Sequence, residues 1–264
     1  MKKAIRIFVI ILLAGVFLFS GWKAVTLCVE YHKGEQTYQE LTQFISIPAT
    51  MTTQSAEVTT EETADRTEGQ EALPPVDWPE VDFDALLEVN SDVVGWIYIP
   101  DTNVNYPIVQ GQDNDKYLRR MITGTYNGAG SIFLDYEVAG DFSGKNSPIY
   151  GHNMKNGTMF APITGYKKQE FYDAHPTGLL MTPEKNYVVH FFSGYVTTSF
   201  GDAWEKEFQE DAFQVWVNGQ KEKSLLTSPV EPQKDDRILT LSTCSYETDD
   251  SRFVLLGVLQ EYPK

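Results

Sequence analysis

The chain has 264 residues, with 37 acidic against 21 basic side chains and a formal net charge of −16. This charge argues against nucleic-acid binding, because that function needs lysine and arginine to neutralise phosphates. Two cysteines exclude a disulfide-rich scaffold and a four-cysteine zinc site. The length allows one folded domain of ordinary size together with an accessory region.

Residues 1–33 are expected to form a transmembrane anchor. Apart from Lys23, residues 7–29 carry no charge. A helix over this run would be about 34 Å long, because each residue adds about 1.5 Å, and it would cross a hydrocarbon core of about 30 Å. Three basic residues precede the run, so we expect a single-pass protein of the cell membrane, with a cytoplasmic amino terminus and an extracellular remainder.

Two other interpretations of this segment fit less well. A cleaved signal peptide has a shorter apolar core and a small-x-small cleavage site, and the run lacks both features. A lipoprotein signal would place a small residue before Cys28, where Leu27 stands. We therefore favour an uncleaved anchor, in which Cys28 is an inert apolar residue of the span.

Residues 34–79 are expected to be an acidic flexible stalk. Thr, Glu, Ser and Ala dominate this segment, and the six acidic residues between positions 57 and 71 face only Arg66 as a counter-charge. Such a segment buries too little apolar surface to offset its ordering entropy. We interpret it as a solvated linker that holds the next domain away from the membrane, not as a metal-binding cluster.

Residues 80–264 have the pattern of a mostly-β domain. Asp82 is expected to cap a short helix, and eight strand-like runs separated by turn residues follow and favour a sandwich or a barrel. The eight runs are 93–99, 105–109, 131–134, 148–150, 178–181, 187–195, 237–243 and 252–259. Residues 158–172 are expected to be partly helical. Residues 202–226 also favour a helix, although Asn218-Gly219 is a hairpin-turn signal.

Cys244 is the foremost candidate for chemistry, because it stands at the end of a predicted strand, where a rigid element can hold it exposed. Its alternative role is a buried structural cysteine. Arg252 begins the last predicted strand. If the two strands are neighbours, its guanidinium favours the thiolate and can stabilise an oxyanion. Alternatively, Arg252 is a surface residue paired with Asp249 or Asp250.

A cysteine nucleophile needs a proton partner, because the leaving amine must be protonated. The sequence has four histidines: His32, His152, His175 and His190. Only His152 combines a position outside the anchor with the exit from a predicted strand, which makes it the best candidate. The histidines and cysteines show no zinc-ligand spacing. Nucleotide-binding loops and the Gly-x-Ser-x-Gly elbow are absent from the sequence.

The residues Thr-Leu-Ser-Thr-Cys at 240–244, followed by Arg252, resemble the Thr-Leu-x-Thr-Cys…Arg signature of sortases. Tyr-Gly-His-Asn-Met at 150–154 resembles the segment that carries their catalytic histidine. Further details are similar to class B sortases: Asn-Gly-Thr-Met-Phe at 156–160, Cys-Ser-Tyr-Glu-x-Asp-Asp-x-Arg-Phe at 244–253, and a long insert at 202–226. The resemblance covers roughly residues 82–264.

The resemblance implies a closed eight-stranded β-barrel with added helices, one of them in the insert between the sixth and seventh strands. It also implies a transpeptidase at the outer face of a Gram-positive-type membrane. The substrates would be secreted proteins with a C-terminal sorting motif, cleaved after Thr. An amine of a peptidoglycan precursor of the lipid II type would accept the acyl group, so that surface proteins become anchored to peptidoglycan. No metal or other cofactor is expected.

The resemblance also implies a role for individual residues. Cys244 would attack the Thr carbonyl and form a thioester, and His152 would act as general acid and then as general base. Arg252 would bind the motif and stabilise the oxyanion. Tyr150, Ser242 and Thr243 would line the peptide groove.

Three alternatives remain open at this stage. A pilus-assembling sortase would share the chemistry but use a Lys amine as acceptor. A hydrolytic cysteine peptidase would transfer the acyl group to water. A non-enzymatic surface module would bury Cys244, and the thiol would then be unreactive.

Overall fold

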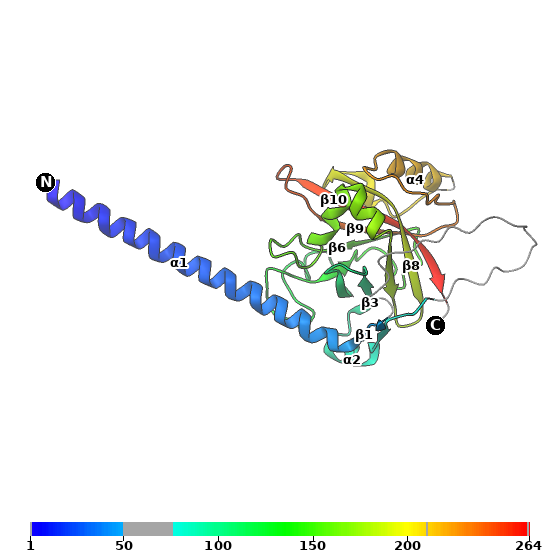
Figure 1. Ribbon diagram of the computed structural model, residues 1–264, viewed down its shortest axis with the longest axis horizontal. Coiled ribbons are helices and arrows are strands. Elements are labelled where there is room, and N and C mark those ends of the chain that lie inside the picture. The colour runs from blue at the N-terminus through cyan, green and yellow to red at the C-terminus, as the bar shows by residue number, and fades with distance from the viewer. Residues whose placement is uncertain (1, 50–75, 210, 263) are drawn as a thin grey trace, which may run out of the picture.

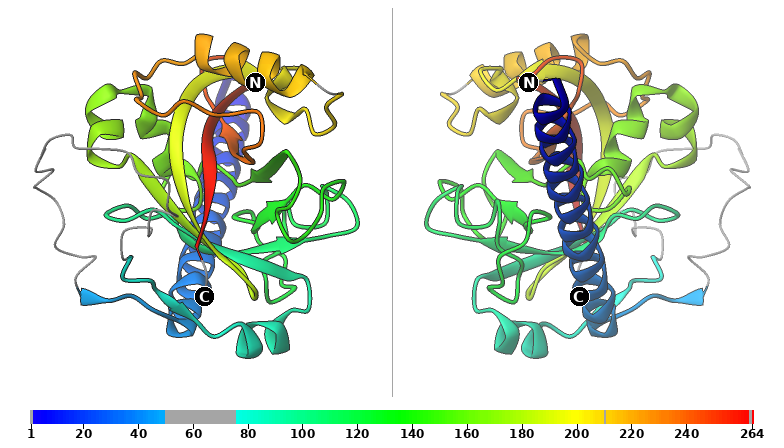
Figure 2. Two further views of the ribbon diagram at one scale, coloured as in Figure 1. Left: turned by 90° about the vertical axis from the view of Figure 1, so that its right-hand side faces the viewer. Right: turned by 90° about the vertical axis from the view of Figure 1, so that its left-hand side faces the viewer.

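The computed structural model describes residues 2–49, 76–209, 211–262 and 264. Its longest element is α1 (Lys2–Leu41), a continuous helix whose N-terminal part lies clear of the rest of the molecule (Figure 1). This helix is long and apolar enough to be a candidate membrane span. Its C-terminal part lies against one side of the folded domain in both views of Figure 2.

The segment predicted as a stalk starts differently in the structure. Residue 33, the predicted end of the anchor, falls inside α1, and Tyr38 and Leu41 are buried against the folded domain. A turn, η1 (Thr42–Phe44), and a short strand, β1 (Ile45–Ser46), follow the helix. Apolar side chains at helical spacing account for this packing. The acidic part of the predicted stalk, residues 50–75, lies outside the described residues.

The folded domain is a closed barrel, so the predicted eight-stranded fold is confirmed. Its strands are β3 (Val93–Tyr98), β4 (Asn105–Gln110), β5 (Ile132–Leu134), β6 (Asn146–Tyr150), β7 (Thr177–Met181), β8 (Asn186–Thr198), β9 (Ile238–Cys244) and β10 (Ser251–Tyr262). Their order around the barrel is β10-β8-β7-β3-β4-β5-β6-β9. The β4–β5 and β6–β9 pairs are parallel and the others are antiparallel. The parallel β6–β9 pair places the ends of both strands at the same edge of the barrel.

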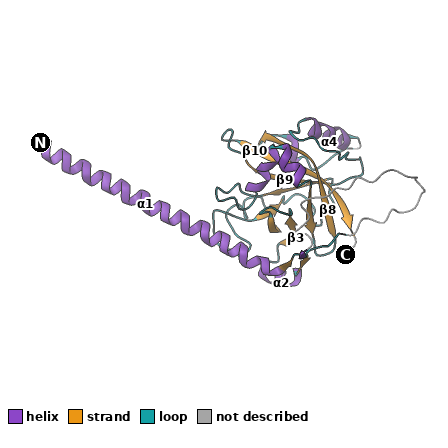
Figure 3. Cartoon of the chain, in the orientation of Figure 1, coloured by secondary structure: helices purple, strands orange, loops and turns teal. Residues whose placement is uncertain are grey.

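Short helices and one further short strand surround the barrel (Figure 3). Asp82 caps α2 (Phe83–Val89), since its Oδ1 accepts a hydrogen bond from the Ala85 N–H at 3.0 Å. The other elements are β2 (Glu80–Val81), η3 (Ala161–Lys167), α3 (Gln169–Ala174), η4 (Asp202–Trp204) and α4 (Ala212–Glu222). Helix α4 includes the Asn218-Gly219 pair, because helical spacing buries Phe213, Trp216 and Val217 on one face.

Strand β10 is apolar on both faces because each face packs against a different layer. Phe253 and Leu255 belong to the main core inside the barrel. Val254 and Leu256 belong to a second cluster, which includes residues of α4. The strand is therefore a continuous apolar run rather than an alternating one. Burial on both faces fixes β10 and, through their pairing, the end of β9.

Candidate active site

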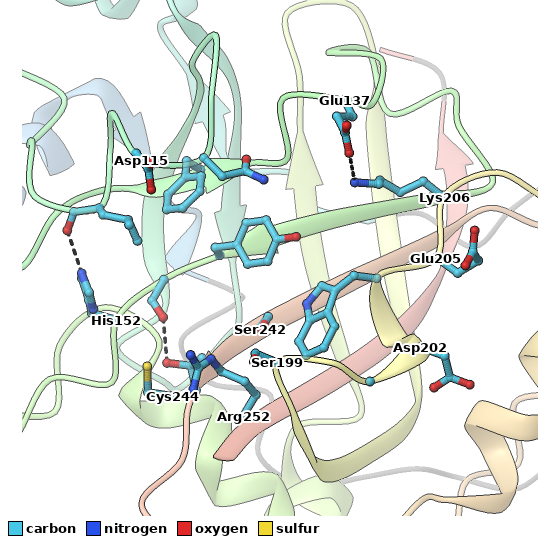
Figure 4. Close-up of a pocket in the computed structure, with 18 of the residues that line it drawn as sticks. Asp115, Glu137, His152, Ser199, Asp202, Glu205, Lys206, Ser242, Cys244 and Arg252 are labelled. Atoms are coloured by element: carbon cyan, nitrogen blue, oxygen red, sulfur yellow. Dashed lines mark hydrogen bonds and ion pairs between the residues drawn. The ribbon is translucent and has the colours of Figure 1, made fainter. Parts of the chain in front are cut away.

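A cleft of about 840 Å³ opens where β6 and β9 end, and the segment that joins β8 to β9 lines part of it (Figure 4). All six side chains singled out in the sequence lie along this cleft: Tyr150, His152, Ser242, Thr243, Cys244 and Arg252. Figure 4 shows His152, Cys244 and Arg252 at one end of it. Residues from three separate strand ends therefore converge on one site.

Cys244 and Arg252 are direct cross-strand partners in the antiparallel β9–β10 pair. The Asn153 side-chain amide donates a hydrogen bond to the Cys244 carbonyl at 2.9 Å, which fixes the backbone below the thiol. Arg252 Nη1 donates to the Ser251 carbonyl at 3.1 Å, and Nη2 lies 3.8 Å from Asp250 Oδ1. This long contact is no bidentate pair, so the guanidinium keeps donors for an incoming carbonyl oxygen.

His152 is held through the residue before it and through its own ring. The Gly151 N–H donates to the Ser242 carbonyl at 3.1 Å, and Thr243 Oγ1 donates to the Gly151 carbonyl at 2.7 Å. His152 Nε2 lies 2.7 Å from the Leu118 carbonyl oxygen. Because a carbonyl only accepts, Nε2 carries a proton in this contact. A backbone group therefore fixes the orientation of the ring. Such a contact could not be predicted from the residue types in the sequence.

Tyr150 is anchored by a buried carboxylate that the sequence analysis missed. Its hydroxyl donates to Asp135 Oδ2 at 2.8 Å, and Asn114 and Lys206 contact the same carboxylate at 3.1 and 3.2 Å. Burial acts to raise the pKa of Asp135, but hydrogen bonds from the Glu137 N–H and Tyr150 and the charge of Lys206 lower it below its ordinary value. Burial and the Asp135 charge raise the pKa of Tyr150, which is therefore a neutral donor.

A family model for the sortase domain matches residues 97–260. The chain belongs to the sortase family, class B. Sortase B of Listeria monocytogenes is 37% identical over 248 residues, which cover 93% of this chain and 92% of that protein. Sortase B of Staphylococcus aureus is 29% identical over 260 residues and 97% of either chain.

Solved sortase B structures share the fold. Sortase B of Bacillus anthracis, in complex with AAEK1, has a TM-score of 0.70 and 30% identity and covers 89% of this chain and 99% of its own. A substrate complex of the Staphylococcus aureus protein has a TM-score of 0.65 and 33% identity, and it covers 68% of this chain and 84% of its own. A sortase B complexed with triglycine gives the same score and identity, with coverage of 68% and 85%. The protein is thus a sortase transpeptidase.

Charged and polar contacts hold the turn after Cys244, residues 245–250, in place. Lys167 Nζ donates to Ser245 Oγ at 2.7 Å and also pairs with Glu247. The hydrogen bond from Lys167, followed by that from Ser245, lowers the pKa of Glu247 to about 2. The Tyr246 hydroxyl donates to the Asn153 carbonyl at 2.7 Å. The turn is therefore linked to both η3 and the loop that carries His152.

The other histidines of this sortase lie away from the cleft. His190 Nε2 bonds Gln260 Oε1 at 2.7 Å on the barrel strands, and the His175 ring packs on Phe171 with centroids 4.5 Å apart. His32 lies on α1. All four histidines belong to the described part of the chain, and His152 alone lines the cleft. The structure therefore leaves one candidate imidazole for proton transfer.

Proposed function

We propose that Cys244 is the nucleophile of this sortase, that His152 is its general acid and base, and that Arg252 binds the motif and stabilises the oxyanion. The observation that carries this assignment is the cross-strand pairing of Cys244 with Arg252 at a cleft that His152 also lines. Tyr150, Ser242 and Thr243 would form the floor of the peptide groove. The reaction is cleavage of a C-terminal sorting motif after Thr and transfer of the acyl group to an amine.

In the first half-reaction the Cys244 thiolate attacks the Thr carbonyl carbon and the carbonyl oxygen becomes an oxyanion, which faces Arg252. The tetrahedral intermediate collapses, the C–N bond breaks, and the protonated His152 ring gives one proton to the leaving amine and becomes neutral. A thioester remains. In the second half-reaction an acceptor amine attacks the thioester, His152 takes the amine proton, and the Cys244 thiolate leaves. The enzyme returns to its starting protonation state.

The proposed partners are secreted proteins with a sorting motif and the amine of a peptidoglycan precursor of the lipid II type. The sortase B structures with substrate and with triglycine support a peptide donor and an amine acceptor. The candidate span in α1 supports attachment to the membrane, with the amino terminus in the cytoplasm and the cleft outside. Surface-protein anchoring to peptidoglycan follows from this combination.

The test uses the full chain in detergent micelles with a panel of quenched fluorescent sorting peptides, with and without amine acceptors. Cys244→Ala should abolish cleavage, and His152→Ala should reduce it by about 10² to 10⁴, the usual contribution of a general acid–base. Cys28→Ala and His175→Ala are matched controls that should retain full activity. Cleavage that survives in Cys244→Ala would overturn the assignment.

The acceptor arm of the same experiment separates the related activities. Ligated product with a peptidoglycan-type amine supports cell-wall anchoring. Ligation only to a Lys amine would indicate pilus assembly, and cleavage without ligation to any amine would indicate a hydrolytic peptidase. A Cys244 thiol that is inert to alkylating reagents would contradict all three chemistries.

A further inference from the structure

Helix α1 meets the barrel where its apolar run ends. Glu30 is the first residue after the uncharged stretch 24–29. The Asn127 side-chain amide donates to the Glu30 carbonyl at 2.9 Å, and the Gly128 N–H donates to Glu30 Oε1 at 2.6 Å. No spacer therefore separates the candidate span from the catalytic domain.

The acidic segment cannot act as that spacer either, because both of its ends are held at the same place. In the β1–β2 pair, Ile45 lies opposite Val81 and Ser46 lies opposite Glu80. The Asp82 N–H also donates to the Phe44 carbonyl at 2.9 Å. A connection that starts and ends at one small sheet adds nothing to the distance between membrane and barrel. That distance is set by α1 alone.

The barrel segment that contacts Glu30 is a hairpin over residues 118–128, which we call the 118–128 hairpin. Arg120 and Tyr126 form an antiparallel bridge, and the Asn127 N–H donates to the Arg119 carbonyl at 3.0 Å. Tyr126 is 66% exposed, and both arginines are exposed. Among the described residues no carboxylate pairs with either arginine. A chain of net charge −16 thus places two unpaired cations and a tyrosine beside the outer end of its span.

These side chains suit the headgroup region of a bilayer. Tyrosine is enriched where membrane and water meet, because its ring is apolar and its hydroxyl is polar. Arginine is attracted to anionic lipid phosphates. Because the hairpin lies beside the apolar helix α1, the surface that the hairpin meets is the membrane that α1 crosses.

The same hairpin also reaches the active site. Its first residue, Leu118, supplies the carbonyl oxygen that holds His152 Nε2 at 2.7 Å. At its other end, the Tyr38 hydroxyl of α1 donates to the Gly130 carbonyl at 2.5 Å, just beyond the hairpin. One short segment therefore contacts the anchor helix, presents cations and a tyrosine to its surroundings, and orients the proposed general acid.

We propose that the 118–128 hairpin rests on the outer-leaflet headgroups of the membrane that α1 spans and seats the barrel directly on the bilayer. This inference rests on the orientation given under the proposed function. Seating fixes the height of the cleft above the lipid, within reach of an acceptor that is itself attached to a lipid. The membrane is thus a docking partner of the folded domain and not only of the anchor.

The test measures the depth of two introduced tryptophans in full-length protein, reconstituted in phosphatidylglycerol–phosphatidylcholine vesicles with a spin-labelled headgroup lipid. Tyr126→Trp places the probe on the hairpin. Leu87→Trp is the matched control, because Leu87 is exposed on α2, which lies at the end of α1 farthest from the amino terminus (Figure 1). The fluorescence of the wild-type protein, which includes Trp22 of the span, is subtracted from that of each variant. Quenching of this wild-type fluorescence shows that α1 is inserted in the membrane.

We expect the fluorescence of the tryptophan at position 126 to be quenched severalfold more strongly than that of the tryptophan at position 87. Equal quenching at the two positions, with Trp22 quenched, would overturn the proposal. In an Arg119→Gln/Arg120→Gln background, quenching at position 126 should weaken, and transfer to a lipid-linked amine should fall while transfer to a soluble amine is retained. Unchanged quenching in that background would overturn the role of the arginines.

The two proposals fail in different ways. Quenching requires no chemistry, so strong quenching at position 126 in a protein that neither cleaves nor ligates would overturn the proposed function alone. Full activity with a soluble amine and no quenching at position 126 would overturn the membrane seating alone.

Discussion

At the scale of single residues, the hydrogen bond between Tyr150 and Asp135 makes the stability of the fold depend on pH. Its hydroxyl is one of several donors that keep the buried Asp135 carboxylate ionised. The folded-state pKa of Asp135 lies below its ordinary value, so this carboxylate stabilises the fold above about pH 4, near the unfolded pKa. The stabilisation is lost as the pH falls through the lower, folded-state pKa.

We predict that Tyr150→Phe lowers the free energy of unfolding at pH 7 by about 2 kcal/mol, because a hydrogen bond to a charged group is lost. The variant should also lose less stability than wild type when acidified, because the folded pKa of Asp135 moves up towards its unfolded value. Urea unfolding at pH 6 and pH 3 measures both effects. The matched control is Tyr136→Phe, whose hydroxyl bonds the exposed Glu137. An acid-induced loss in Tyr150→Phe as large as in wild type would contradict this account.

Gly151 controls the position of His152 through packing. A Cβ at this position would lie 2.4 Å from Ile132 Cδ1 and 2.8 Å from the Phe160 ring. We predict that Gly151→Ala costs about 1 to 3 kcal/mol of stability, the usual cost of overpacking, and lowers kcat/KM by at least about tenfold because a small displacement of a catalytic group is costly. Gly144→Ala, whose nearest neighbour is 3.8 Å away, should change neither quantity. Peptide cleavage and thermal unfolding of the two variants decide the point.

At the scale of elements, the strands could be predicted because their composition and turns are local properties. The pairing of Cys244 with Arg252 followed from two adjacent strands joined by a short turn. The Leu118 carbonyl could not be predicted, because a backbone acceptor carries no residue signature. Asp135 did leave a signal, since it is an acidic residue directly after an apolar strand. Its role, however, depends on Tyr150 and Lys206, which are distant in sequence.

The end of α1 is an element that packing holds in place. Leu41 is 4% exposed and belongs to the main core, while Gln39 is exposed on the same helix. We predict that Leu41→Ala destabilises the domain by about 2 to 4 kcal/mol through lost burial and a cavity, and that Gln39→Ala changes stability by less than about 0.5 kcal/mol. Near-ultraviolet circular dichroism of the full chain during thermal unfolding reports the barrel. Equal stability of the two variants would show that α1 is not docked.

At the scale of the whole molecule, the composition of the predicted stalk concealed a docked helix end. Acidic and small residues dominate the segment as a whole, and the stalk was predicted from this overall composition. The apolar residues at the start of the segment, Tyr38, Leu41 and Ile45, therefore did not affect the prediction. Tyr38 and Leu41 lie three residues apart, which is the spacing of one helix face, and Ile45 follows in β1. The signal was present, but averaging over the entire segment removed it.

The connection between β1 and β2 gives the last prediction. Because Ser46 and Glu80 are paired, the chain between them is a loop whose closure cost grows with its length. Replacing residues 50–75 with a Gly-Ser linker of about four residues leaves about a third of that loop and should raise the free energy of unfolding by about 1 kcal/mol. Quenching of the tryptophan at position 126 by headgroup-labelled lipid should stay the same, because α1 sets the height of the barrel. A change in quenching would show that the segment is a spacer after all.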